Sequence, residues 1–189
     1  MNRLKSGITA LAALAIALPL LAQQPPRPRV SPTETVTADI DGNHLKLVYG
    51  RPYTKDPKTG ETRQIFGKVV PYGKVWRTGA NEATLLTTET PIVMGETTVP
   101  AGTYSLFTVP MQEGTSKLVI NKRTGQWGVP YNEKSEATNE LARVDMKTEK
   151  LEKPVDQFTM AIEKNPSGGG VIKMAWENTQ YTVPFTVKK

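Results

Sequence analysis

Short alternations of apolar and polar residues run along most of this chain. Residues 36–40 alternate in this way, and residues 45–49 do so again. Asp41-Gly42 lies between the two runs, and this dipeptide favours the two-residue turn that joins antiparallel strands. Because a period of two puts every second side chain on the same face, each run can bury one face. The segment therefore predicts a β-hairpin with one side against a core.

More strand-like runs follow, separated by turns rich in glycine and proline. They cover residues 84–90, 92–99 with a break at Gly95-Glu96, 103–109, 118–120, 158–162, 171–176 and 181–187. Only residues 133–144 have a helical pattern, which is polar and predicts a turn or two of surface helix. Many short strands with so little helix predict an all-β fold, a single-domain antiparallel β-sandwich or a barrel-like fold.

The first residues predict where the protein goes. Basic residues at Arg3 and Lys5 precede an almost purely apolar run from Ile8 to Leu21, and Ala22 suits a cleavage site. We interpret residues 1–22 as a cleaved signal peptide, residues 23–32 as a proline-rich linker and residues 33–189 as one β-rich domain. The protein is then periplasmic or secreted. The alternative is an uncleaved anchor, but the run is shorter than the roughly 20 residues of a spanning helix. No later segment is apolar enough to span a membrane.

Composition narrows the possible chemistry. The chain has no cysteine and one histidine, which excludes disulfides, thiol catalysis, cysteine-bound zinc and any site of several histidines. We expect no metal and no cofactor. Residues 23–80 hold 10 basic and 5 acidic side chains, against 12 and 13 in residues 81–189. This basic excess favours an anionic ligand or is simply a solvated surface. No basic run and no nucleic-acid-binding motif is present, so a nucleic-acid partner is not expected.

The segment Trp76–Thr84 has the densest mixture of functional groups. Arg77 adds a guanidinium, which binds carboxylates and phosphates through paired hydrogen bonds. Asn81 and Glu82 add an amide and a carboxylate that suit polar recognition. Arg51 and Arg63 lie earlier in the chain and would complete an anion site if they converge with Arg77. Alternatively, Arg77 or Arg51 pairs with Glu82 or another carboxylate and fixes a loop, and residues 78–81 are merely a turn.

The three tryptophans differ in their expected roles. Trp176 lies in an apolar run and is expected in the core. Trp127 lies between Gln126 and Gly128 in a predicted loop, and we expect it to be an exposed stacking surface at the edge of the site. Glu82 could also act as a general acid or base, but glycoside hydrolysis needs a second carboxylate and the sequence shows none at short spacing.

Several motifs together resemble one family. They are Tyr49-Gly50-Arg51-Pro52, Ile65-Phe66-Gly67, Val70-Pro71-Tyr72-Gly73, the run from Val75 to Thr84, Pro100–Phe107 and Gln126-Trp127-Gly128. In this order they resemble a bacterial secreted family known only as domain of unknown function 2911. The resemblance covers about residues 31–187 and implies an envelope location and one β-rich domain, but no activity. One departure is the longer loop from Tyr53 to Thr62, which leaves the role of Arg63 open.

The sequence thus predicts a secreted cell-envelope binding module rather than an enzyme. Its ligand would be small and anionic or carbohydrate-like. The expected site residues are Arg51, Arg77, Asn81, Glu82 and Trp127. Two alternatives remain: a hydrolase that uses Glu82, and a structural envelope protein in which the motif is an internal polar pin.

Overall fold

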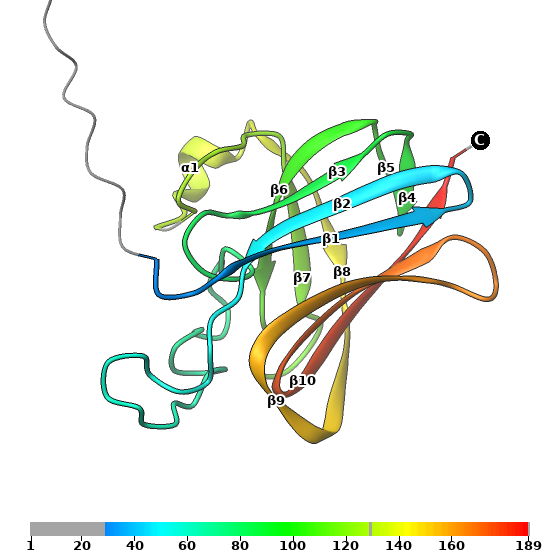
Figure 1. The fold of residues 1–189 in the computed structure, drawn as a ribbon. Helices are drawn as coiled ribbons and strands as arrows, with labels where there is room; N and C mark the ends of the chain where they lie inside the picture. The colour runs from blue at the N-terminus through cyan, green and yellow to red at the C-terminus, as the bar shows by residue number, and fades with distance from the viewer. Residues whose placement is uncertain (1–28, 129, 189) are drawn as a thin grey trace, which may run out of the picture.

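The computed structural model describes residues 29–128 and 130–188, which form two antiparallel β-sheets (Figure 1). One sheet has six strands in the order β1-β2-β3-β6-β7-β8, and the other has four in the order β5-β4-β10-β9. The strands are β1 (Thr33–Ile40), β2 (Asn43–Gly50), β3 (Thr84–Thr88), β4 (Ile92–Met94), β5 (Thr97–Val99), β6 (Gly102–Val109), β7 (Lys117–Asn121), β8 (Glu140–Asp145), β9 (Lys147–Lys164) and β10 (Gly170–Val187). The prediction of an all-β, sandwich-like fold is confirmed. The predicted signal peptide and most of the predicted linker lie outside the described residues.

The first hairpin forms as its sequence predicts. Ile40 pairs with Asn43, and the two turn residues between them have positive φ angles, 50° at Asp41 and 84° at Gly42. This backbone matches the twist of the two strands that it joins. The carboxylate of Asp41 also accepts a hydrogen bond of 2.7 Å from the backbone N–H of Gly169. The turn therefore helps to hold the loop between β9 and β10.

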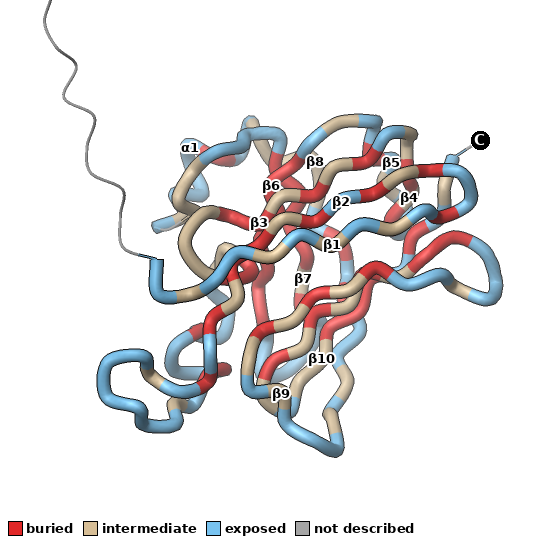
Figure 2. The backbone as a smooth tube through the Cα atoms, viewed as in Figure 1, coloured by how far each residue is buried: buried red, intermediate tan, exposed pale blue. Residues whose placement is uncertain are grey.

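The core lies between the two sheets. Leu45 and Leu47 on β2 are fully buried, and Trp176 on β10 is 1% exposed, as its sequence context predicts. The hydroxyl of Tyr49 accepts a hydrogen bond of 2.9 Å from the backbone N–H of Met160 and so joins the two sheets. Figure 2 shows buried residues on the facing strands and mostly exposed residues on the loops and turns.

Part of the six-stranded sheet is buried on both faces. Leu106 belongs to the main core, whereas its neighbour Phe107 packs in a second cluster with Val119. Successive strand residues point to opposite faces, so this second cluster covers the other side of the sheet. Tyr131 packs against it from a loop, with its ring centroid 4.7 Å from that of Phe107. The loop after β7 therefore rests on a small core of its own.

The prediction of helix over residues 133–144 is wrong beyond its first turn. The helix α1 covers only Glu133–Glu136, with Asn132 as its N-cap. Residues 140–145 instead form β8, which pairs with the edge of β7. The residues Glu, Leu, Ala and Arg favour a helix in isolation, but the hydrogen bonds offered by an unpaired sheet edge outweigh that preference.

The longest connection is the loop between β2 and β3, residues 51–83. It lies at one end of the sandwich, close to one end of the β9–β10 pair (Figure 1). Isolated bridges tie it to both sheets, because Tyr53 pairs with Gln157 of β9 and Trp76 pairs with Thr108 of β6. This loop carries most of the predicted site residues. Within the described residues, no helix has the length and apolar character needed to cross a bilayer.

Candidate functional site

The segment Trp76–Thr84 is a tightly bent loop with unusual backbone angles. Thr78 and Asn81 have φ angles of 55° and 65°, and Gly79 lies between them at 142°. A β-branched residue such as Thr78 rarely adopts a positive φ, so the surrounding contacts must enforce this shape. One of these contacts is a hydrogen bond of 2.5 Å from the hydroxyl of Thr84 to the carbonyl of Thr78.

Glycines from two other motifs allow the loop to approach its neighbours. A Cβ atom at Gly50 would lie 2.0 Å from the carbonyl oxygen of Ala80, so only glycine fits there. A Cβ atom at Gly128 would lie 2.8 Å from the Cβ atom of Arg77. The segments around Gly50, Trp76–Thr84 and Gly128 therefore pack together, although they are far apart in the sequence. This contact explains in physical terms why each segment needs its glycine.

Arg77 is the central charged residue of this cluster. Its Nη1 donates hydrogen bonds to the carbonyls of Asn81, at 2.5 Å, and Trp127, at 2.9 Å. Its Cζ atom lies 5.7 Å from the centroid of the Trp127 ring, within the range of a cation–π contact. Burial lowers the pKa of the guanidinium, and the charge of Glu82 partly opposes that shift. Among the described residues, no carboxylate forms a salt bridge with Arg77.

A cavity of about 400 Å³ opens beside Arg77. It is lined by Val30, Ser31, Pro52, Tyr53, Pro57, Arg63, Val69, Trp76, Arg77, Gly79, Ala80, Asn81, Trp127 and Trp176. Two arginines and no acidic residue are among these described lining residues. Three tryptophans and a tyrosine supply aromatic surface. The described lining of the cavity thus combines two guanidinium groups with four aromatic side chains.

Arg63 reaches the same cavity from another part of the loop. Its guanidinium donates to the carbonyls of Tyr53, at 2.6 Å, and Thr54, at 3.3 Å. Asp56 lies 3.7 Å from its Nη1. The side chain is 26% exposed. The longer loop therefore still brings Arg63 to the cavity that Arg77 lines.

Arg51 does not join them. It forms an ion pair of 2.6 Å with Glu34 on β1. It also donates to the carbonyl of Phe158 at 3.1 Å and to the hydroxyl of Thr159 at 2.9 Å, both on β9. These contacts connect the two sheets, and Arg51 is absent from the residues that line the cavity. The structure thus places Arg51 in the fixing role that the sequence left as an alternative.

Asn81 and Glu82 hold the segment that precedes β1. The side-chain amide of Asn81 donates a hydrogen bond of 3.0 Å to the carbonyl of Ser31. Glu82 forms an ion pair of 2.5 Å with Arg29 rather than with Arg77. Asn81 still lines the cavity, but Glu82 lies in a separate hollow of about 200 Å³. The five predicted site residues therefore divide, and Arg77, Asn81 and Trp127 are the ones that share the cavity.

The tryptophans form a layered wall. Trp76 stacks on Trp176 with ring centroids 5.8 Å apart and an interplanar angle of 22°. Its indole N–H donates a hydrogen bond of 3.1 Å to the carbonyl of Gly79, which stabilises the motif loop. Trp127 is half-buried rather than an open platform, because Arg77 lies over its ring. Trp76 and Trp176 therefore form a stacked pair, whereas Trp127 contacts Arg77.

Sequence reasoning missed Glu177. This residue lies at an irregularity in the pairing of β10 with β9 and has a φ of 50°. Its carboxylate accepts hydrogen bonds from the backbone N–H groups of Ile65, at 3.1 Å, and Phe66, at 3.3 Å. Glu177 thereby anchors the part of the loop that follows Arg63. The available signal was a carboxylate directly after the buried run that ends at Trp176.

The fold and this cavity define a class: a sandwich-like all-β protein with a small arginine- and tryptophan-lined cavity at one end. The chain belongs to the family described as Protein of unknown function (DUF2911), whose model matches residues 31–185. The predicted family is therefore confirmed. No curated protein and no solved structure matches the chain.

Proposed function

We propose that this protein is a secreted binding module of the cell envelope whose ligand is a small organic anion with a ring-shaped body. Arg77 is the observation that carries the proposal. Its guanidinium is half-buried beside the cavity and hydrogen-bonds only to carbonyls among the described residues. A charge removed from water normally needs an opposite charge. A bound carboxylate or phosphate would supply it.

The electrostatics of the cavity support an anion. Arg63 and Arg77 both line it, and none of its described lining residues is acidic. Guanidinium groups suit carboxylate and phosphate because their planar N–H groups match two oxygens at once. The basic excess of residues 23–80 would also attract anions from a distance.

The shape of the cavity supports a small ligand with a flat or ring-shaped face. Its volume of about 400 Å³ falls within the range usual for small-molecule sites. Trp76, Trp127 and Tyr53 offer aromatic surface against which a sugar or arene ring can pack. A sugar acid or an aromatic carboxylate combines these features.

A hydrolase based on Glu82 has weaker support. Glu82 forms an ion pair with Arg29, with 41% of its side chain exposed. It is the one carboxylate among the described residues that line its hollow. Glycoside hydrolysis usually needs a second carboxylate nearby. The described residues that line this hollow offer none.

The structural alternative rests on a specific observation. Arg77 joins two loops through the carbonyls of Asn81 and Trp127. An arginine in that position can serve the fold alone, and the contacts of Arg51 with Glu34 and Phe158 are of this kind. The two roles differ in what the loss of Arg77 would change, which is ligand affinity for one and folding stability for the other.

Calorimetry with matched ligands tests the proposal. We expect glucuronate and benzoate to bind, while the uncharged glucose and benzyl alcohol bind far more weakly. Loss of a charged hydrogen bond costs about 1.5–3 kcal/mol, so Arg77→Gln should weaken anion binding roughly 10- to 100-fold. Arg51→Gln is the matched control and should retain the affinity. If no anion binds the folded protein, or if Arg77→Gln and Arg63→Gln both bind as well as the wild type, the proposal is wrong.

Secretion has its own test. The mature protein should begin at or near Gln23, because the apolar run before it has the length and composition of a signal peptide. The intact mass of the protein isolated from its native host measures this directly. A mass that includes residues 1–22 would contradict the proposal.

A further inference from the structure

We infer that residues 29–32, the strap, form a removable wall of the anion cavity and that Asn81 and Glu82 hold this wall in place. The inference rests on the proposed function for its consequence, but the strap itself can be tested without any ligand. It gives the two polar residues of the motif a positioning role.

Three of the four strap residues are bound to neighbouring segments. Arg29 pairs with Glu82 at 2.5 Å, and the carbonyl of Ser31 accepts from Asn81 at 3.0 Å. The carbonyl of Pro32 accepts a hydrogen bond of 2.8 Å from the backbone N–H of Arg51. The strap is thus fastened to the motif loop on one side and to the end of β2 on the other.

Val30 lies between these attachment points and shapes the cavity. It lines both the cavity of Arg77 and a neighbouring cavity of about 340 Å³. Tyr53 and Pro57 line both cavities as well. Val30 is 55% exposed, although it is apolar. The two cavities are therefore adjacent, and displacement of the strap would join them into one longer groove.

The strap is attached weakly enough to move. The side chains of Arg29 and Glu82 are 51% and 41% exposed, and ion pairs at such exposure contribute little and weaken in salt. Closed, the strap limits the ligand to the cavity of about 400 Å³ beside Arg77. Open, it admits a longer anionic chain. Val30 therefore sets the ligand size, and Glu82 sets how often the wall opens.

Limited trypsin digestion tests the attachment directly. The bond Arg29–Val30 is a trypsin site within the strap, and its cleavage rate follows the open population when closing is fast. Glu82→Gln removes the ion pair and should speed this cleavage roughly two- to fivefold. Raising the salt to about 0.5 M should speed cleavage of the wild type in the same way, because salt screens an exposed pair.

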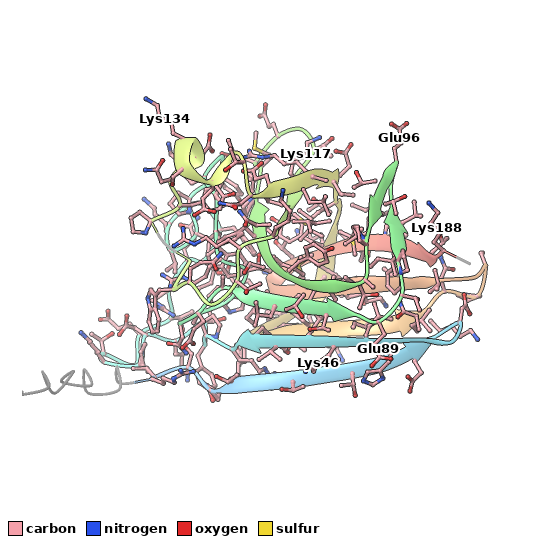
Figure 3. The ribbon with its side chains drawn as sticks, turned by 90° about the horizontal axis from the view of Figure 1, so that it is seen from above. Lys46, Glu89, Glu96, Lys117, Lys134 and Lys188 are labelled. Atoms are coloured by element: carbon pink, nitrogen blue, oxygen red, sulfur yellow. The ribbon has the colours of Figure 1, made fainter. Side chains whose placement is uncertain are left out.

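Glu96→Gln is the control variant. It removes the same charge from the exposed turn between β4 and β5, far from the strap, where Figure 3 shows Glu96 pointing away from the body. Its cleavage at Arg29 should match the wild type, as should cleavage at Lys58 in every variant. Equal trypsin cleavage rates at Arg29 in Glu82→Gln and in the wild type would refute the claim that Glu82 holds the strap in place.

A ligand-binding experiment distinguishes the claim about the strap from the claim about the binding site. Val30→Gly opens the wall without touching either arginine, so digalacturonate should gain affinity relative to galacturonate. If both sugar acids bind through Arg77 but Val30→Gly leaves the ratio of their dissociation constants unchanged, the proposed binding site is supported and the role of the strap as a wall is refuted. If Glu82→Gln speeds cleavage at Arg29 but no anion binds, the attachment of the strap is supported and the proposed function is refuted.

Discussion

At the scale of single residues, Gly50 tests how tightly the motif loop packs. A methyl group there would lie 2.0 Å from the carbonyl oxygen of Ala80, which is a backbone atom and cannot rotate away as a side chain could. We expect Gly50→Ala to lower the free energy of unfolding by about 3 kcal/mol or more, since the end of β2 or the loop must shift. Urea denaturation measures the loss.

Gly42 is the matched control for that variant. It has a φ of 84° and no atom within 4 Å of an added Cβ. Gly42→Ala should therefore cost about 1 kcal/mol, through backbone strain alone. Equal losses in the two variants would mean that the close approach at Gly50 has no energetic weight.

The role of an individual arginine was beyond the reach of the sequence. Arg51 and Arg77 both lie in motif segments, and residue type alone gives them the same chemistry. Their partners come from distant segments: Phe158 and Glu34 surround Arg51, whereas Trp127 meets Arg77. The buried position of Trp176 could be predicted because its own apolar neighbours determine it.

At the scale of elements, strands with one apolar face were predictable and polar strands were not. The hairpin of β1 and β2 has alternation and a turn dipeptide, and its register follows from them. Residues 147–150 of β9 are polar or charged and mostly exposed, yet they pair with residues 179–182 of β10. This stretch is a strand because its backbone hydrogen-bonds to β10, and the pattern of its side chains does not predict that pairing.

Glu177 connects β10 to the loop that bears Arg63. Its carboxylate accepts two backbone hydrogen bonds, from Ile65 and Phe66. We expect Glu177→Ala to cost about 1.5–3 kcal/mol, the usual value for bonds to a charged group. Hydrogen exchange at the amides of Ile65 and Phe66 should speed up together with this loss.

Glu177→Gln provides the control for this anchor. It keeps one acceptor oxygen and the same length, so it should lose less stability and protect at least one of the two amides. Unchanged exchange at both amides in Glu177→Ala would show that the loop holds its shape without this anchor.

At the scale of the whole molecule, burial of tyrosine should limit alkaline stability. Burial raises the pKa of Tyr181 to about 12. Because the folded pKa is above the unfolded value of about 10, this stability is complete below pH 10 and is lost as the pH rises toward 12. The loss should approach 2–3 kcal/mol, or about 1.4 kcal/mol for each pKa unit.

Urea denaturation at a series of alkaline pH values measures this decline. Tyr181→Phe removes the ionising group and should flatten the curve between pH 10 and pH 12, although burial raises the pKa of Tyr49 and Tyr131 as well. The same decline in Tyr181→Phe and wild type would contradict the assignment to Tyr181.

The central claim is that the cavity binds an anion through Arg77, and a pair of fluorescent dyes tests it most directly. Anilinonaphthalene sulfonate and phenylnaphthylamine share their rings and differ in the sulfonate. Their dissociation constants in wild type, Arg77→Gln and Arg51→Gln measure the coupling between ligand charge and Arg77. We predict that the wild type and Arg51→Gln prefer the anion by about tenfold or more, and that Arg77→Gln loses most of this preference. The same preference in all three proteins would contradict the account.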